Sequence, residues 1–124
     1  MAGVAQGTLR GQARNGAEEF LGVPYAAPPV GPGRWRPPRP PARWHGVRKA
    51  TRPAPACLQF WPFGLADPQA VSEDGLYLDV YRPRSARPGA RLPVILWMHG
   101  GAYSQGTGTQ FGGRTMADPP GAWW

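Results

Sequence analysis

The prolines between residues 26 and 55 place the tightest constraint on what this chain can fold into. They include Pro28, Pro29, Pro32, Pro37, Pro38, Pro40 and Pro41. Each proline lacks a backbone N–H donor and holds φ near one value, so neither a helix nor a central strand can persist through so dense a run. The whole chain has 18 Gly and 17 Pro in 124 residues, which also disfavours long helices. We therefore predict that residues 26–55 form an extended wrapper.

Such a wrapper could be a disordered proline-rich linker. Disordered linkers are poor in large apolar side chains, whose burial favours an ordered, packed state. The region and its continuation contain Trp35, Trp44, Val47, Phe60, Trp61 and Phe63. This content favours ordered packing over disorder.

Two short apolar stretches near the N-terminus are candidate strands. Residues 4–9 and 20–25 flank a segment in which Gly11, Asn15 and Gly16 provide turn chemistry. This arrangement predicts an antiparallel pair.

Residues 76–81 show the period-two pattern of a strand. Leu76, Leu78 and Val80 alternate with more polar neighbours, and the pattern stops at the breaker Arg82-Pro83. The alternation predicts a strand that buries one face.

A second strand is predicted at residues 92–98, which read Leu-Pro-Val-Ile-Leu-Trp-Met. A nearly continuous apolar run with β-branched residues at its middle is typical of a central strand covered on both faces. The run leads directly into His99, Gly100, Gly101 and Ala102. Small residues at a strand end permit unusual φ values, so successive backbone N–H groups can face one ligand atom. Taken alone, these four residues would more often be a glycine-rich tight turn without function.

Charge and cysteine content limit the partners of the chain. The net charge of +7 is almost wholly arginine, because Lys49 is the only lysine, and such a charge could attract nucleic acid or an anionic membrane. The arginines are spread from Arg10 to Arg114 with no nucleic-acid motif, so we expect no nucleic-acid partner. Cys57 is the only cysteine, which rules out an intrachain disulfide and disfavours a metal-binding cluster.

No targeting signal is visible in the sequence. Residues 1–10 contain no apolar stretch of signal-peptide length, and no run approaches the roughly 18 apolar residues of a membrane span. As written, the chain is expected to be soluble and cytoplasmic, with no membrane partner.

Four blocks in a fixed order resemble the start of the type-B carboxylesterase and cholinesterase family. The blocks are residues 20–31 with Arg34-Trp35 and Pro37-Pro38, residues 44–51 with Cys57-Leu58-Gln59, residues 72–81, and residues 92–103. Together they cover roughly residues 7–112. The resemblance implies one incomplete domain over residues 1–124, the N-terminal part of an α/β-hydrolase fold that consists mostly of strands and Pro/Gly-rich loops here.

The resemblance also implies a function and a set of site residues. The parent protein would hydrolyse small-molecule carboxylic esters through a serine acyl-enzyme, without a cofactor or metal. Gly101 and Ala102 would donate the backbone N–H groups of the oxyanion hole, with Gly100 shaping the turn and His99 beginning it. The catalytic serine, acid and histidine of the family would lie downstream, so this chain alone is expected to be inactive.

Two residues near the loop offer weaker catalytic alternatives. His99 could act as a base, because histidine titrates near neutral pH. The family base lies far downstream, so we assign His99 to loop support. Ser104 lies in a degenerate Ala-x-Ser-x-Gly pattern with a predicted strand before it, but the residues after it are poor at beginning the helix that a nucleophile elbow needs. Ser104 is therefore expected to be an ordinary loop residue.

The resemblance further implies an ion pair and a departure from the family. Arg34 and Glu73 would form a partly buried pair that ties the wrapper to the third block. Gly75 stands where the family commonly has a cysteine that pairs with the one matching Cys57, so we expect Cys57 to be a free, buried thiol.

The end of the chain, residues 119–124, also departs from the family pattern, which suggests a truncation or a frameshift. Two other readings therefore stay open, namely a non-catalytic binding protein of the same family and a nonfunctional truncated fragment. A Gly-x-Ser-x-Gly block in the downstream reading frame would favour the enzyme.

Overall fold

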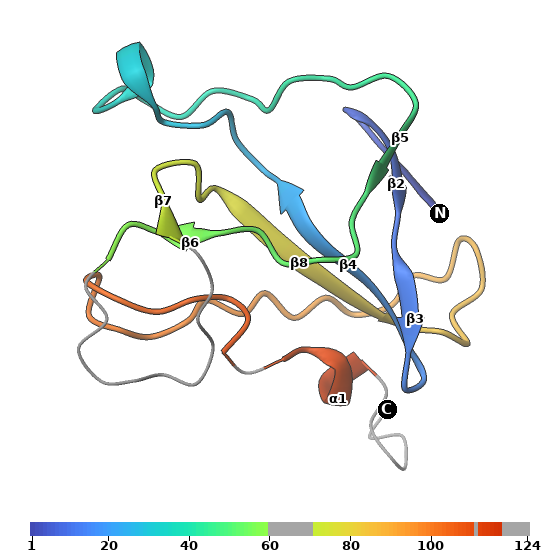
Figure 1. The fold of residues 1–124 in the computed structure, drawn as a ribbon. Helices are drawn as coiled ribbons and strands as arrows, with labels where there is room; N and C mark the ends of the chain where they lie inside the picture. Colours follow the sequence, from blue (N-terminus) through green and yellow to red (C-terminus); the bar gives the residue numbers. More distant parts are fainter. Residues whose placement is uncertain (60–70, 111, 118–124) are drawn as a thin grey trace.

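The computed structural model describes residues 1–59, 71–110 and 112–117, and these residues form small sheets joined by long loops (Figure 1). One three-stranded sheet has the order β1-β2-β5, with β1 Ala2–Val4, β2 Gly7–Arg10 and β5 Val47–Lys49. A second has the order β3-β4-β8, with β3 Gln12–Arg14, β4 Ala17–Pro24 and β8 Tyr77–Pro83. The remaining elements are the two-stranded sheet of β6 Ala56–Cys57 and β7 Val71–Ser72, the 3₁₀ turn η1 Gly31–Gly33 and the helix α1 Arg114–Ala117. Within the described residues, none of the helices has the length and hydrophobicity required to span a bilayer.

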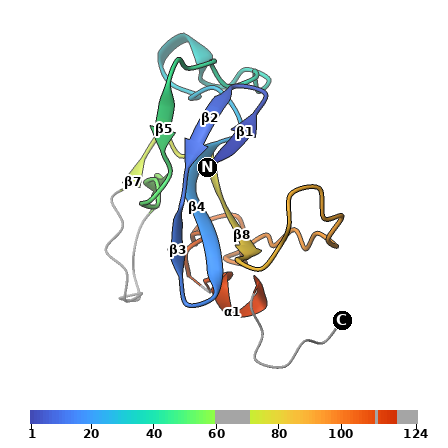
Figure 2. The same cartoon turned by 90° about the vertical axis from the view of Figure 1, so that its right-hand side faces the viewer.

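The N-terminal strands pair differently from the prediction. Residues 4–9 and 20–25 do not pair with each other, because β1 pairs with β2 and β3 pairs with β4. Figure 2 shows the two hairpins one above the other. The β3-β4 turn is Asn15-Gly16, whose φ values of 45° and 79° suit the two-residue hairpin turns that match strand twist. Such a short turn closes at a lower entropic cost than the longer predicted connection.

The proline-rich segment is largely the extended wrapper that was predicted. Apart from η1, residues 26–46 contain no helix or strand, and the segment then adds β5 as a parallel edge strand beside β2. Trp44 ties the wrapper to the first hairpin, because its backbone N–H donates to Gln6 O (3.0 Å) and its Nε1 donates to Thr8 O (3.0 Å).

The apolar side chains of the wrapper were expected to be packed, and this is true only where the wrapper contacts a sheet, as at Trp44. Trp35 is 95% exposed, because it follows η1 at the far end of an extended loop, drawn in cyan in Figure 1. Val47 is 47% exposed on the edge strand. Phe60, Trp61 and Phe63 lie outside the described residues.

A small core joins the two larger sheets. Leu9, Phe20 and Ala50 are buried against one another, and Ala2, Val23 and Trp44 pack around them. Backbone hydrogen bonds from Ala50 N to Arg10 O (2.8 Å) and from Leu21 N to Ala50 O (2.9 Å) connect the end of the wrapper to both sheets. Among the residues that the structure describes, few large side chains are buried, so this core is small.

The strand predicted in the third block is confirmed as β8, which pairs antiparallel with β4. Its buried face is the opposite of the predicted one, since Leu78 and Val80 are about two-fifths exposed while Asp79 and Tyr81 point inward. Asp79 faces inward because its Oδ1 accepts a hydrogen bond from Gly22 N (2.8 Å) at an irregularity in β4. Burial raises the pKa of the Asp79 carboxyl above its ordinary value, although this hydrogen bond opposes the shift.

The predicted central strand at residues 92–98 is wrong for this structure. These residues form no strand, Val94 is 90% exposed and Leu96 is 78% exposed. A central strand needs hydrogen-bonding neighbours on both edges and packed layers on both faces. The described part of the chain provides neither, so the segment runs as the irregular orange trace in Figure 1.

Candidate functional site

Residues 99–106, called the glycine loop below, form a tight turn that follows the exposed apolar segment. Gly101 O accepts hydrogen bonds from Ser104 N (3.0 Å), Gln105 N (3.2 Å) and Ser104 Oγ (3.0 Å). A Cβ on Gly101, where φ is 128°, would overlap the Gln105 backbone. Glycine is therefore required at position 101 of this turn.

Two consecutive residues of the glycine loop have a left-handed backbone although neither is glycine. Ala102 has φ 52° and Tyr103 has φ 59°, and both side chains are exposed. A non-glycine residue in this region costs on the order of 1–3 kcal/mol and is concentrated at functional sites. No burial of these two side chains offsets the cost, so the strain is held by the hydrogen bonds to Gly101 O.

The backbone amides at the centre of the turn are available to a ligand. In the part of the chain that the structure describes, neither Gly101 N nor Ala102 N donates a hydrogen bond, and Ala102 is exposed. A Cβ on Gly100 would meet no other residue, so the approach beside it is open. The turn thus presents successive N–H donors with little steric hindrance.

The two side chains considered as catalytic alternatives make local contacts. His99 Nδ1 lies 2.7 Å from Gly100 O, a contact that needs the Nδ1-protonated tautomer if it is a hydrogen bond. The Ser104 hydroxyl donates to Gly101 O and sits inside the turn, without the strand before it that a nucleophile elbow requires. Both residues therefore contribute to the shape of the loop.

A contact that sequence reasoning missed anchors the end of the glycine loop. Gln59 Nε2 donates to Gly106 O (2.9 Å), and Gly106 N donates to Gln59 Oε1 (2.7 Å). Gln59 belongs to the Cys57-Leu58-Gln59 block, so the sequence indicated its importance but gave no partner for it. The pairing connects residues 47 positions apart.

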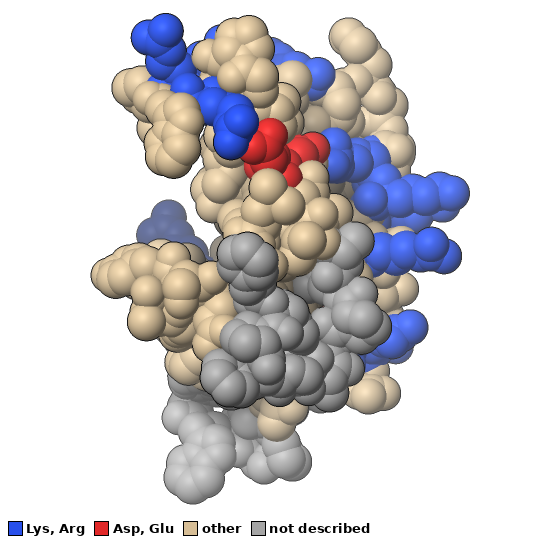
Figure 3. All heavy atoms as spheres, turned by 60° about the vertical axis from the view of Figure 1, so that its left-hand side comes forward, with Lys and Arg blue, Asp and Glu red and all other residues tan. Residues whose placement is uncertain are grey.

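The expected ion pair between the wrapper and the third block is present. Arg34 Nη2 lies 3.0 Å from Glu73 Oε1, but the two side chains are 53% and 36% exposed, so the pair is more open to solvent than expected. On the face of the molecule drawn in Figure 3, a small cluster of acidic side chains lies beside basic side chains. An ion pair this exposed contributes at most about 1 kcal/mol to stability.

Cys57 is exposed, which corrects the expectation of a buried thiol. Successive residues of a strand point to opposite faces, and Ala56 takes the buried position in the two-residue strand β6. The Cys57 Sγ lies 3.7 Å from Gly75 O, and a Cβ added to Gly75 would lie 2.9 Å from that sulfur. In a disulfide, the distance from one Cβ to the far sulfur is about 3.0 Å.

We expect Gly75→Cys to form a disulfide with Cys57 and to raise the free energy of unfolding. Closing a loop of this length is worth about 3 kcal/mol. The added Cβ would also lie 3.0 Å from the backbone of Cys57, so a small shift is needed and the expected gain falls to about 2 kcal/mol. Urea unfolding with and without a reductant measures the gain. Gly75→Ser is the matched control, and a variant whose thiols stay free in air would contradict the prediction.

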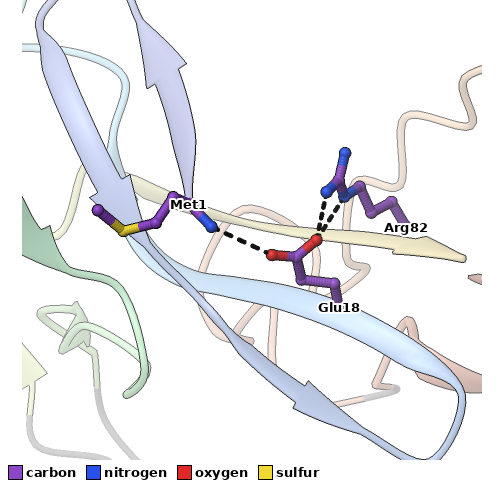
Figure 4. A network of polar contacts seen from close by, with 3 residues as sticks. All are labelled: Met1, Glu18 and Arg82. Atoms are coloured by element: carbon purple, nitrogen blue, oxygen red, sulfur yellow. Dashed lines mark hydrogen bonds and ion pairs between the residues drawn. The ribbon is translucent and has the colours of Figure 1, made fainter. Parts of the chain in front are cut away.

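Two adjacent glutamates of β4 form separate ion-pair networks. Glu18 accepts from Arg82 Nε (2.7 Å) and Nη2, and the Met1 amino group lies 3.4 Å from its other oxygen (Figure 4). Burial acts to raise the pKa of the Glu18 carboxyl, but Arg82 and the amino group outweigh it, and the pKa lies below its ordinary value. This network joins β4 to β8.

Glu19 lies on the other face of β4 and has no exposed side-chain surface. It accepts hydrogen bonds from Arg114 Nε (2.6 Å) and Gln12 Nε2 (2.7 Å), and Arg14 Nε lies 3.8 Å away. The hydrogen bond to Glu19 raises the pKa of the Arg114 guanidinium. Because Arg114 begins α1, Glu19 ties the segment after the glycine loop to the N-terminal sheet. Sequence reasoning missed this pair, since nothing local marks a glutamate beside a turn as buried.

Comparisons with known proteins agree with the block resemblance. The model of the carboxylesterase family matches residues 1–120. The chain is 40% identical over 115 residues to a cocaine esterase of Homo sapiens, covering 85% of this chain and 21% of that protein. It is 42% identical over 111 residues to an acylcarnitine hydrolase of Mus musculus, covering 82% and 20%.

Solved structures give the same picture. A PNB esterase superposes with a TM-score of 0.86 at 37% sequence identity, covering 93% of this chain and 24% of that chain. The chain therefore spans about a fifth to a quarter of the length of the proteins it matches.

Proposed function

Because this chain belongs to the carboxylesterase family, we propose that it is the N-terminal segment of a serine carboxylic-ester hydrolase and supplies its oxyanion loop. The predicted fold class is confirmed, since the matched structures are α/β-hydrolase esterases and the described residues are mostly strands and loops. Relatives named as esterases support a small-molecule carboxylic ester as the substrate of the parent protein.

In the proposed mechanism, Gly101 and Ala102 stabilise charge on the reacting carbonyl. When a serine oxygen attacks the ester, negative charge develops on the carbonyl oxygen, and backbone N–H groups placed beforehand lower the barrier by about 2.7–4 kcal/mol each. Gly100 keeps the approach to the turn open, and His99 supports the beginning of the loop. No metal or cofactor is needed for these steps.

The observation that carries this assignment is the strained backbone at Ala102 and Tyr103 beside amides that the described chain leaves unused. Strain in a tight turn without function would be removed easily by placing glycine at either position. A turn that must hold N–H donors at fixed positions gains from rigid placement, and that gain can offset the cost of the strain.

The rest of the catalytic machinery is proposed to lie outside these 124 residues. Acylation requires a nucleophile beside a base, and the base beside an acid that orients it. Ser104 donates its hydroxyl to Gly101 O and meets no base in the described residues. Donors alone can stabilise charge but cannot form an acyl-enzyme.

We expect the isolated chain to hydrolyse p-nitrophenyl acetate no faster than buffer. We expect hydrolysis when residues 1–120 replace the matching N-terminal residues of a PNB esterase, because the two segments superpose closely and the recipient supplies the nucleophile, base and acid. Initial rates of purified chain and chimera measure both results. Ser104→Ala removes one of the three hydrogen bonds to Gly101 O, so it should lower the rate of the chimera modestly without abolishing hydrolysis. A folded but inactive chimera, or activity of the isolated chain that disappears with Ser104→Ala, would contradict the proposal.

A further inference from the structure

The side chain of Gln59 is fully engaged by backbone groups. Its Nε2 donates to Cys57 O (3.1 Å) and to Gly106 O (2.9 Å), and its Oε1 accepts from Gly106 N (2.7 Å). A carboxamide has two N–H hydrogens on one side and an acceptor on the other, and all of them are used here. The opposite orientation would place Oε1 against two carbonyl oxygens, so the contacts determine which way the amide points.

The partner of Gln59 is Gly106, the last residue of the glycine loop, which packs against the first residues of the same loop. Gly106 is buried, with φ 120°, and a Cβ added there would overlap the His99 ring and lie 2.6 Å from Gly100 O. The backbone of Gly106 therefore packs against the first residues of the loop. Any movement of Gly106 would remove the support under His99 and Gly100.

The turn that presents the N–H donors is closed just before Gly106. Ser104 N and Gln105 N both donate to Gly101 O, and Gln105 is bonded covalently to Gly106. Fixing the position of Gly106 therefore fixes both ends of the turn. The first end is fixed because Gly106 packs against Gly100, and the second because Gly106 is bonded to Gln105. The left-handed backbone at Ala102 and Tyr103 needs such external support, because its strain favours relaxation.

We propose that Gln59 is a positioning residue of the oxyanion loop, which it holds in place through Gly106. That the loop is an oxyanion loop rests on the proposed function. That Gln59 holds the loop in place is a statement about the 124-residue chain itself. A residue of the second block would then control the shape of the loop at the end of the fourth. Gln59 touches no reacting atom, and its effect passes through backbone hydrogen bonds.

Hydrogen exchange of the isotopically labelled chain, followed by NMR, tests this role without any ester turnover. We expect Gln59→Ala to speed exchange of the amides of Gly106, Ser104 and Gln105 by about tenfold, since each lost hydrogen bond removes a comparable factor of local protection. The amide of Leu21, which donates to Ala50 O, should keep its exchange rate and report that the sheets remain folded.

Two further variants separate positioning from general stability. Gln59→Glu keeps an acceptor for Gly106 N and loses the donor to Gly106 O, so it should restore protection of Gly106 in part. Gln110→Ala removes an exposed glutamine from the same region and should change nothing. The proposal is overturned if Gln59→Ala speeds exchange at Gly106 alone, or if Leu21 speeds up in parallel. Because no substrate is involved, these outcomes are independent of whether the chimera is active.

Discussion

Replacing the backbone N–H of Ala102 with an ester oxygen is expected to lower kcat of the chimeric esterase by about 100- to 1000-fold. Lactic acid at position 102 keeps the methyl group and the backbone shape while removing one donor. An oxyanion donor acts mainly in the transition state, so kcat should fall with little change in KM. Steady-state kinetics with p-nitrophenyl acetate measures both constants.

The same chemistry at Gly108 provides the control for this prediction. Gly108 is exposed and a Cβ there would meet nothing within 4 Å, so glycolic acid at that position should leave the kinetics unchanged. A chimera that keeps its full kcat with lactic acid at 102 would show that Ala102 N is not a donor. That result would contradict the proposed role of Ala102 and leave the family assignment unchanged.

Arg114→Met is expected to lower the free energy of unfolding by about 2–3 kcal/mol. The substitution leaves the Glu19 carboxylate without its closest cation in a position that has no solvent exposure. Breaking a fully buried pair costs about 3–5 kcal/mol. The expected loss is smaller because Arg114 is itself 40% exposed and Arg14 remains 3.8 Å from Glu19. Urea unfolding followed by tryptophan fluorescence gives the value.

A double variant tests whether the loss comes from the unpaired charge. Glu19→Gln in the Arg114→Met background removes that charge and keeps an acceptor for Gln12 Nε2, so part of the stability should return. Arg87→Met, at an exposed arginine with no ion pair in the described residues, is the matched control. Equal losses for Arg87→Met and Arg114→Met would refute the importance of the pair.

Local patterns predicted the elements whose causes are local. The period-two alternation of residues 76–81 predicted a strand, and β8 is present. The prolines predicted an extended wrapper, because each removes a donor and restricts φ wherever it stands. Asn15 and Gly16 indicated a turn, although which strands the turn joins depended on its short length.

Sequence patterns gave wrong predictions where the structure of a segment depends on which other segments pack against it. Residues 92–98 have the composition of a central strand, yet such a strand forms only with neighbours on both edges. Leu78 and Val80 have the spacing of a buried face, but the Asp79 contact with Gly22 points the other face of β8 inward. Spacing specifies which residues share a face and leaves open which face is buried.

The sequence by itself determined the family, through four blocks in order, and it indicated a loop with unusual backbone angles at residues 99–102, because small residues permit such angles. Only the tertiary structure decided what supports that loop. Gln59 reaches Gly106 across 47 residues, and Glu19 reaches Arg114 across 95. Pairings over such separations carry no periodic signal, because each depends on how independent segments are brought together by the shared core.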